Sequence, residues 1–269
     1  MNRYGPFNWI LLLLSSLVLL FLIAPLAGLF IHTGSKELFE TAGDKAVQES
    51  IMLTVWVSFA ATLFFSIGAI PFAWLLARKN FPLKSVVQGI IDLPVVLPHT
   101  AAGIALLGLI AREGPLGKAA SLIGLNLVNN PAGIALAMAF VSLPFLINSA
   151  RDGFAAIPER LEKAALNLGA SNSRVFFTIS LPLAWRSIIT GFVMMFARGM
   201  SEFGAVVIIA YHPMIAPVLI YDRFSSFGLK YARPAAVLFI MVALIVFTIL
   251  RLLSEKRNPV ETRVEHVDS

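Results

Sequence analysis

Ionisable side chains inside long apolar runs are the residues of this sequence that could do chemistry. Asp92 and His99 lie within one such run, and Arg198 and Glu202 lie within another. Each ionisable group costs roughly 2.5–3.5 kcal/mol to insert at the centre of a membrane helix, so each needs a reason to be there. A pairing of acid with base, or a polar path for an ion, would supply such a reason.

Residue spacing predicts which of these side chains share a helix face. Asp92 and His99 are seven residues apart, which places them near one face of a single helix. Arg198, Ser201 and Glu202 follow one another at spacings of three and one, and Arg198 and Glu202 are one helical turn apart. We therefore expect two polar groups, one on each helix.

The two groups would form a polar path if their helices are neighbours, and Thr100 would add a neutral hydroxyl. The candidate translocation path then comprises Asp92, His99, Thr100, Arg198, Ser201 and Glu202. Local interpretations stay open for each charged member. Arg198 and Glu202 can simply neutralise each other, His99 can bond a backbone carbonyl, and Asp92 can pair near its own helix end.

These residue types do not form a metal site or a hydrolase site. Neither a second His nor a Cys stands near His99, and the chain has no cysteine at all. The spacing of the Ser, His and Asp residues does not indicate a nucleophilic triad. We expect no catalytic residue and no metal.

Composition indicates the kind of element that holds these residues. Of the 269 residues, 58% are hydrophobic and 13% are charged, whereas a soluble domain has about 45–50% apolar and about 25% charged residues. The sequence therefore predicts an all-α polytopic membrane protein surrounded by lipid. The net charge of +6 is typical of membrane proteins with basic cytoplasmic loops, so we expect no nucleic-acid partner.

Six apolar runs predict six transmembrane helices, at residues 9–31, 51–77, 85–111, 131–150, 187–210 and 234–253. The first run is too long for a signal-peptide core, so we expect an uncleaved helix. Pro94 and Pro98 are expected to break the third helix. Lys and Arg are concentrated in alternate loops, including 78–84 and 151–186, which predicts that both termini are cytoplasmic.

The segment 151–186 is too long for a simple connection. It reads as two short helices: Gly169 would end the first in the left-handed conformation, Ser171 would cap the second, and Leu181-Pro182 would close it. One interpretation is a helix pair resting on the membrane interface. The other is a docking element for a cytoplasmic partner.

The same segment resembles the cytoplasmic signature of ABC importer permeases. That signature is Glu-Ala-Ala, three residues, Gly, nine residues, then Ile, any residue and Leu-Pro. The matching residues here are Lys163, Ala164, Ala165, Gly169, Ile179, Leu181 and Pro182. Lys163 replaces the acid of the signature, and Glu162 stands one residue earlier, where it can substitute.

The resemblance implies a type I ABC importer permease fold, in which this segment is the coupling helix that docks on an ATPase subunit. It implies a homodimer of permeases, two ATPase subunits and an external oxyanion-binding protein. No phosphate-binding loop is present in the sequence. The chain is therefore expected to be no enzyme and to hold no cofactor, with ATP and Mg bound by the partner ATPase.

Two further stretches, 93–104 and 196–205, are similar to signatures of oxyanion permeases. The Pro98-His99-Thr100 form is more similar to molybdate and tungstate permeases than to sulfate permeases. The resemblance covers residues 49–253, leaving 1–48 as a first helix with an external loop and 254–269 as a cytoplasmic tail. The alternatives are a sulfate or other oxyanion permease and, in another class, an ion-coupled secondary transporter in the cell membrane.

Overall fold

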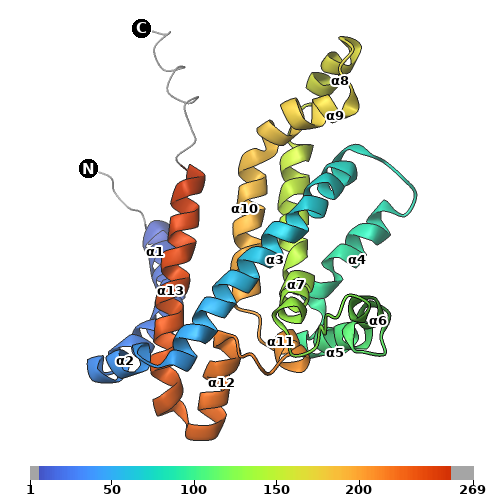
Figure 1. Ribbon diagram of the computed structural model, residues 1–269. Coiled ribbons are helices and arrows are strands. Elements are labelled where there is room, and N and C mark those ends of the chain that lie inside the picture. Colours follow the sequence, from blue (N-terminus) through green and yellow to red (C-terminus); the bar gives the residue numbers. More distant parts are fainter. Residues whose placement is uncertain (1–5, 256–269) are drawn as a thin grey trace.

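The computed structural model describes residues 6–255, and within that range the chain forms helices and no strands (Figure 1). Apolar helices satisfy all their backbone hydrogen bonds internally, which is what a lipid environment requires. Five helical segments of the described chain are long and apolar enough to cross a membrane, and a sixth segment passes the same test when a bent pair of helices is counted as one span. The predicted all-α polytopic class is confirmed.

The helix bundle is centred on α7 (Pro131–Ala155), which packs along α3 (Lys45–Arg78) and α10 (Leu181–Met200). The largest buried side chains of this contact include Leu146, Phe154 and Phe196. The 34 residues of α3 make a helix about 50 Å long, against a hydrocarbon core of about 30 Å. Accordingly, α3 runs diagonally across the bundle (Figure 1).

Two other spans stand to one side of this core. Helix α1 (Pro6–Ile31) lies beside α13 (Leu229–Glu255), and its apolar side chains are exposed along most of its length. The start of α1, the end of α13 and helix α8 (Glu159–Asn167) lie toward the same end of the molecule (Figure 1). Short helices α2 (Ser35–Ala42), α6 (Pro115–Ser121) and α12 (Ala216–Phe227) lie toward the opposite end.

A stripe of small hydroxyl residues lies on the buried face of α3. These residues recur every four positions and are Ser50, Thr54, Ser58, Thr62 and Ser66. The Ser58 hydroxyl donates to the Phe196 carbonyl of α10 at 2.8 Å. A Cβ on Gly199 would lie only 2.7 Å from the Ser58 oxygen, so a glycine lets α10 approach this closely. Small residues thus bring two spans into close contact.

The third run is not one straight helix. It divides into α4 (Lys84–Val96) and α5 (His99–Ile110), which are bent by 112°. Pro98 lacks a backbone N–H, and the residue before it, Leu97, is extended, so the helix cannot continue. Pro94, the other expected break, lies within α4. Asp92 and His99 therefore do not share a helix face, and that prediction is wrong.

The fifth run also differs from its prediction, at both ends. It starts at α9 (Asn172–Val175), passes through a π-helical turn (Phe176–Ser180) and continues as α10. Leu181-Pro182 therefore does not close a short helix, because Pro182 occupies the first turn of α10 directly after the π turn. At the other end the helix stops at Met200 and a short helix, α11 (Gly204–Ile209), follows.

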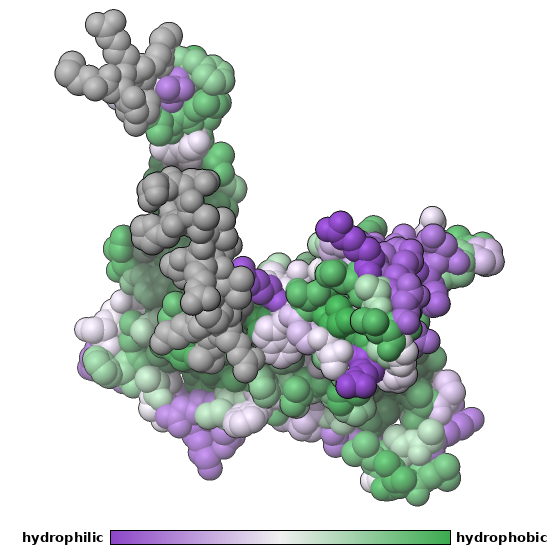
Figure 2. All heavy atoms as spheres, turned by 90° about the horizontal axis from the view of Figure 1, so that it is seen from above, coloured by the Kyte–Doolittle hydropathy of each residue, from purple (hydrophilic) through white to green (hydrophobic). Residues whose placement is uncertain are grey.

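The molecular surface is mostly apolar. Figure 2 looks onto the α8 end and shows hydrophilic side chains gathered in separate patches between apolar areas. The exposed large hydrophobic residues are spread over α1, α3, α4 and α13. Such a surface is suited to lipid contact rather than to water. The predicted tail 254–269 lies almost wholly outside the described residues.

Candidate functional site

The breaks in the third and fifth runs bring their polar residues together, because α5 packs against α11. We call the group His99, Arg198, Ser201 and Glu202 the polar junction. Arg198 Nη2 lies 3.0 Å from Glu202 Oε2 and 2.8 Å from His99 Nε2. His99 Nδ1 lies 3.3 Å from the same Glu202 oxygen. Arg198 Nη2 also lies 3.2 Å from His99 Nδ1, so the guanidinium contacts both ring nitrogens of His99.

Glu202 is the buried anchor of the polar junction. Its side chain is 1% exposed, whereas those of Arg198 and His99 are 25% and 39% exposed. The second carboxylate oxygen of Glu202 accepts a hydrogen bond from the backbone N–H of Ala205 at 2.9 Å. Glu202 therefore caps α11 and balances Arg198 at the same time. Both the local pairing of Arg198 with Glu202 and the meeting of the two runs are observed.

Of the remaining predicted path residues, Ser201 and Thr100 lie at or beside the polar junction, and Asp92 lies on α4 against α7. The hydroxyl of Ser201 lies 3.4 Å from Arg198 Nη1 and is exposed. Thr100 is exposed beside His99 at the start of α5. Asp92 is not in the junction: it accepts a hydrogen bond of 2.6 Å from Asn148 of α7. Asp92 therefore pairs across to α7 and not within its own helix, and sequence reasoning did not identify Asn148.

Two glycines allow the backbones of α5 and α11 to meet. A Cβ on Gly103 would lie 2.9 Å from the Cα and carbonyl oxygen of Ala205. A Cβ on Gly204 would lie 2.6 Å from the Cβ of His99. Such distances leave no room for a larger residue, so the junction depends on both glycines. Sequence reasoning missed this role, although both glycines fall in the two stretches singled out there.

At the far end of the molecule, α8 forms the first half of the predicted docking element. Gly169 follows α8 with a φ of +86°, which confirms the left-handed turn. The Ser171 hydroxyl accepts from the backbone N–H of Arg174 at 3.3 Å, which confirms the cap. Leu161, Leu166 and Leu168 of this region are exposed. An apolar surface at a polar end of the molecule is typical of a protein contact.

The other residues of the cytoplasmic signature lie on two different surfaces. Lys163 is exposed and pairs with Glu159 at 2.7 Å, and Ala164 is exposed beside it. Ala165 is half-buried. Ile179, Leu181 and Pro182 lie in the long helix 172–200, where Ile179 and Leu181 are half-buried and Pro182 is exposed. These side chains thus span from α8 to the root of the fifth span.

Glu162 points inward, in contrast to its neighbours on α8. Its side chain pairs with Arg78 of α3, with Nε and Oε2 2.8 Å apart, and Ser180 donates to its other oxygen at 2.6 Å. We call Arg78, Glu162 and Ser180 the Glu162 clasp. Burial raises the pKa of Glu162, but hydrogen bonds from Arg78 and Ser180 and the charge of Arg78 outweigh it, so the pKa lies below its ordinary value. Arg78 and Ser180 were missed as partners.

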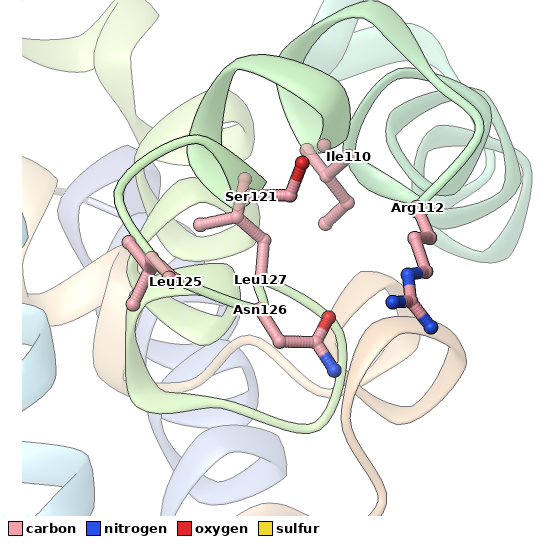
Figure 3. A pocket seen from close by; sticks show the side chains of 8 residues that line it. Ile110, Arg112, Ser121, Leu125, Asn126 and Leu127 are labelled. Carbon is pink, nitrogen blue, oxygen red and sulfur yellow. The ribbon is translucent and has the colours of Figure 1, made fainter.

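A cavity lies near the end of α5, outside the predicted site. Its volume is about 320 Å³, and Figure 3 shows Ile110, Arg112, Ser121 and Asn126 among its lining side chains. None of its lining residues belongs to the polar junction or to the Glu162 clasp. Between residues 6 and 255, no cluster of three or more His, Asp or Glu side chains could hold a metal ion.

Comparison with known proteins identifies relatives over most of the chain. Residues 69–258 match the model of a family described as binding-protein-dependent transport system inner membrane component. A molybdate/tungstate transport system permease protein, WtpB, of Thermococcus kodakarensis is 39% identical over 247 residues, covering 91% of this chain and 95% of the relative. A sulfate transport system permease protein, CysT, of Synechocystis is 30% identical, with 88% and 86% covered.

The fold is also found among solved structures. A bacterial ABC transporter involved in the import of the acidic polysaccharide alginate matches with a TM-score of 0.72, at 18% identity, over 93% of this chain and 96% of that one. At this identity the likeness concerns the fold alone. It confirms the predicted type I ABC importer permease fold.

Proposed function

The chain belongs to the family of binding-protein-dependent transport system inner membrane components, and we propose that it is the permease through which an ABC importer carries molybdate or tungstate. One observation carries the choice of ion: the chain is 39% identical to a molybdate/tungstate permease and 30% identical to a sulfate permease. The chain is thus a multi-pass membrane transport subunit, and the ion, the partners and the orientation are our proposals.

The polar junction supports an oxyanion as the transported ion. Arg198 is a partly exposed cation beside the hydroxyl of Ser201, and such donors suit the oxygens of a tetrahedral dianion. The buried carboxylate of Glu202 largely neutralises Arg198. A path must hold its ion weakly enough to release it, and a balanced guanidinium meets this condition better than an isolated one. His99 and Thr100 would complete the path, with Asp92 outside it.

The proposed complex contains two copies of this chain, two ATPase subunits beneath them and an external oxyanion-binding protein. The exposed side chains of Leu161, Ala164 and Leu166 on α8 favour docking on the ATPase, which makes the α8 end cytoplasmic. Both termini would then be cytoplasmic too. A second copy would enclose the open side of the polar junction. ATP and Mg would be bound by the ATPase, and this chain would hold no cofactor.

Ion uptake into proteoliposomes tests the proposal. Vesicles containing this chain, its ATPase and its binding protein are supplied with molybdate, tungstate or sulfate, with and without ATP on the ATPase side. We expect ATP-dependent uptake of molybdate or tungstate in preference to sulfate. Preferential uptake of sulfate would overturn the ion assignment and keep the family. Uptake by this chain alone without ATP would favour an ion-coupled secondary transporter instead.

A further inference from the structure

The Glu162 clasp joins four segments at one buried point. Arg78 is the last residue of α3, and it donates both to Glu162 of α8 and to the carbonyl of Ile157 in the turn before α8, at 2.8 and 3.1 Å. Ser180, the last residue of the π turn, donates to the other oxygen of Glu162. The clasp therefore ties α8 to two membrane spans at once.

The clasp is buried among apolar side chains. The side chains of Arg78 and Glu162 are only 8% and 10% exposed, and Ser180 is fully buried. Phe176 packs edge-on against Trp74 above this point, with ring centroids 5.5 Å apart. The indole N–H of Trp74 is buried and has no hydrogen-bond partner among the described residues. Hydrogen bonds in such apolar surroundings are stronger than in water.

We propose that Arg78, Glu162 and Ser180 are positioning residues that transmit the movement of α8 to α3 and to the helix 172–200. This inference rests on the proposed function, since α8 moves only if an ATPase docks on it. Glu162 itself would not contact the ATPase, because it faces the interior while Leu161 and Lys163 on either side are exposed. The docking surface and the transmitting contact are thus separate parts of one short helix.

The path of transmission follows the packing of the spans. The helix 172–200 carries Arg198 and leads into Glu202. Both it and α3 pack along α7. The π turn that holds Ser180 interrupts the regular helical bonding of the fifth span, and such turns occur often at functional sites. A displacement of α8 would therefore reach the root of the span whose other end forms the polar junction.

The number of oxyanions imported per ATP hydrolysed tests this role in proteoliposomes holding the whole complex. Glu162→Gln keeps the shape of the side chain without its charge, and Ser180→Ala removes one hydrogen bond. We expect both variants to assemble and hydrolyse ATP, with the transport ratio lowered about fivefold or more. Glu159→Gln is the matched control, because it breaks the exposed pair with Lys163 on the same helix, and its ratio should equal that of the parent.

A purely structural role would give a different result. It would lower the melting temperature or the yield of complex while the ratio in assembled complexes stayed unchanged, and that result would overturn the proposal. If Glu162→Gln does not assemble, Ser180→Ala is the deciding variant. An unchanged number of oxyanions imported per ATP in Ser180→Ala would then overturn the proposal. An equal loss in Glu159→Gln would likewise overturn it, because the effect would then belong to the surface of α8.

A second readout separates this inference from the identity of the ion. The chain has no cysteine, so Val96→Cys, at an exposed position near the break of the third run, places a unique thiol there. We expect a non-hydrolysable ATP analogue to change the labelling rate of this thiol in the parent complex and not in complexes that also carry Glu162→Gln. An equal change of labelling rate in the parent and the Glu162→Gln complexes would overturn the transmitting role of the clasp. A change that depends on Glu162, without oxyanion uptake by the parent, would support the clasp and overturn the proposed ion.

Discussion

The carboxylate of Glu202 accepts a hydrogen bond from the backbone N–H of Ala205 at 2.9 Å, so a charged side chain caps the short helix after the break. The other oxygen of Glu202 contacts Arg198. Glu202 thus fixes the backbone of the junction and sets its charge. The two roles can be separated by substitution, because an amide retains an acceptor oxygen and an alanine does not.

We expect Glu202→Gln to keep the cap of α11 and to leave Arg198 without its counter-charge. The junction should then hold a dianion more firmly, and calorimetry on the purified chain should detect tungstate binding that the parent lacks. Glu202→Ala should additionally lower the free energy of unfolding by about 1 kcal/mol through the lost cap. Equal stability of the two variants would contradict the capping role.

Replacing Arg198 should separate transport from assembly. We expect Arg198→Ala to lower oxyanion uptake by about tenfold or more, since the cation facing the path is lost. Arg198→Lys keeps a charge beside Glu202 and should retain part of the uptake. Co-purification of the ATPase is measured in parallel and should not change. Loss of ATPase binding in Arg198→Ala would show that Arg198 serves the structure of the chain rather than its path.

The turn after α8 should be sensitive to backbone strain alone. A Cβ on Gly169 meets no atom within 4 Å, but the φ of +86° is unfavourable for a branched residue. We expect Gly169→Val to distort the turn at a cost of about 1–2 kcal/mol. ATP hydrolysis should continue while uptake falls. Gly169→Asn is the control, because asparagine tolerates this conformation, and normal uptake in Gly169→Val would contradict the role of the turn.

Close packing of α5 on α11 predicts opposite effects for two glycines of one helix. Gly103→Ala should destabilise the chain by about 1–3 kcal/mol, because its Cβ would press on the backbone of Ala205. Gly108→Ala meets no atom within 4 Å and should stabilise α5 by about 0.5–1 kcal/mol. Thermal unfolding of the detergent-solubilised chain measures both. Similar shifts for the two variants would contradict the observed contact.

The stability contributed by Glu162 should depend on pH in a defined direction. Its pKa in the folded chain lies below the ordinary value of 4.5, so its contribution is complete well above pH 4.5 and is lost as the pH falls from 4.5 through the folded pKa. The parent should therefore unfold at a higher temperature than Glu162→Gln at pH 7, and the difference should shrink below pH 4.5. A difference that grows toward acid pH would contradict the pairing with Arg78.

Much of the architecture follows from the sequence because it depends on local patterns. Apolar runs predict the long helices, since length and hydropathy decide what can cross a membrane. The turn at Gly169 and the cap at Ser171 are also local, and both are confirmed. The family was recognisable for the same reason, because its signature is a pattern of spacing within one segment.

The break at Pro98 follows from a local pattern, but the irregularities of the fifth run do not. Pro182 predicts a helix end because it lacks a backbone N–H. Instead, the backbone makes a π turn just before it, and the helix continues as α10. Residues 201–203 include no proline or other residue type that predicts a helix end. The break is stabilised by the hydrogen bond of Glu202 to Ala205 and by the contact of α11 with α5. Partners distant in sequence, such as Arg78 for Glu162, become visible only when the chain is folded.

The hydroxyl stripe of α3 has a consequence for how the bundle can rearrange. Ser50, Thr62 and Ser66 each donate to a carbonyl of their own helix, so they do not tie α3 to its neighbours. Thr54 accepts from the start of α12. Towards α10, Ser58 supplies the cross-helix hydrogen bond, on a surface smoothed by Gly199. Any shift of α3 along α10 would therefore have to break the hydrogen bond of Ser58 and separate Phe59 from the rings of Phe192 and Phe196.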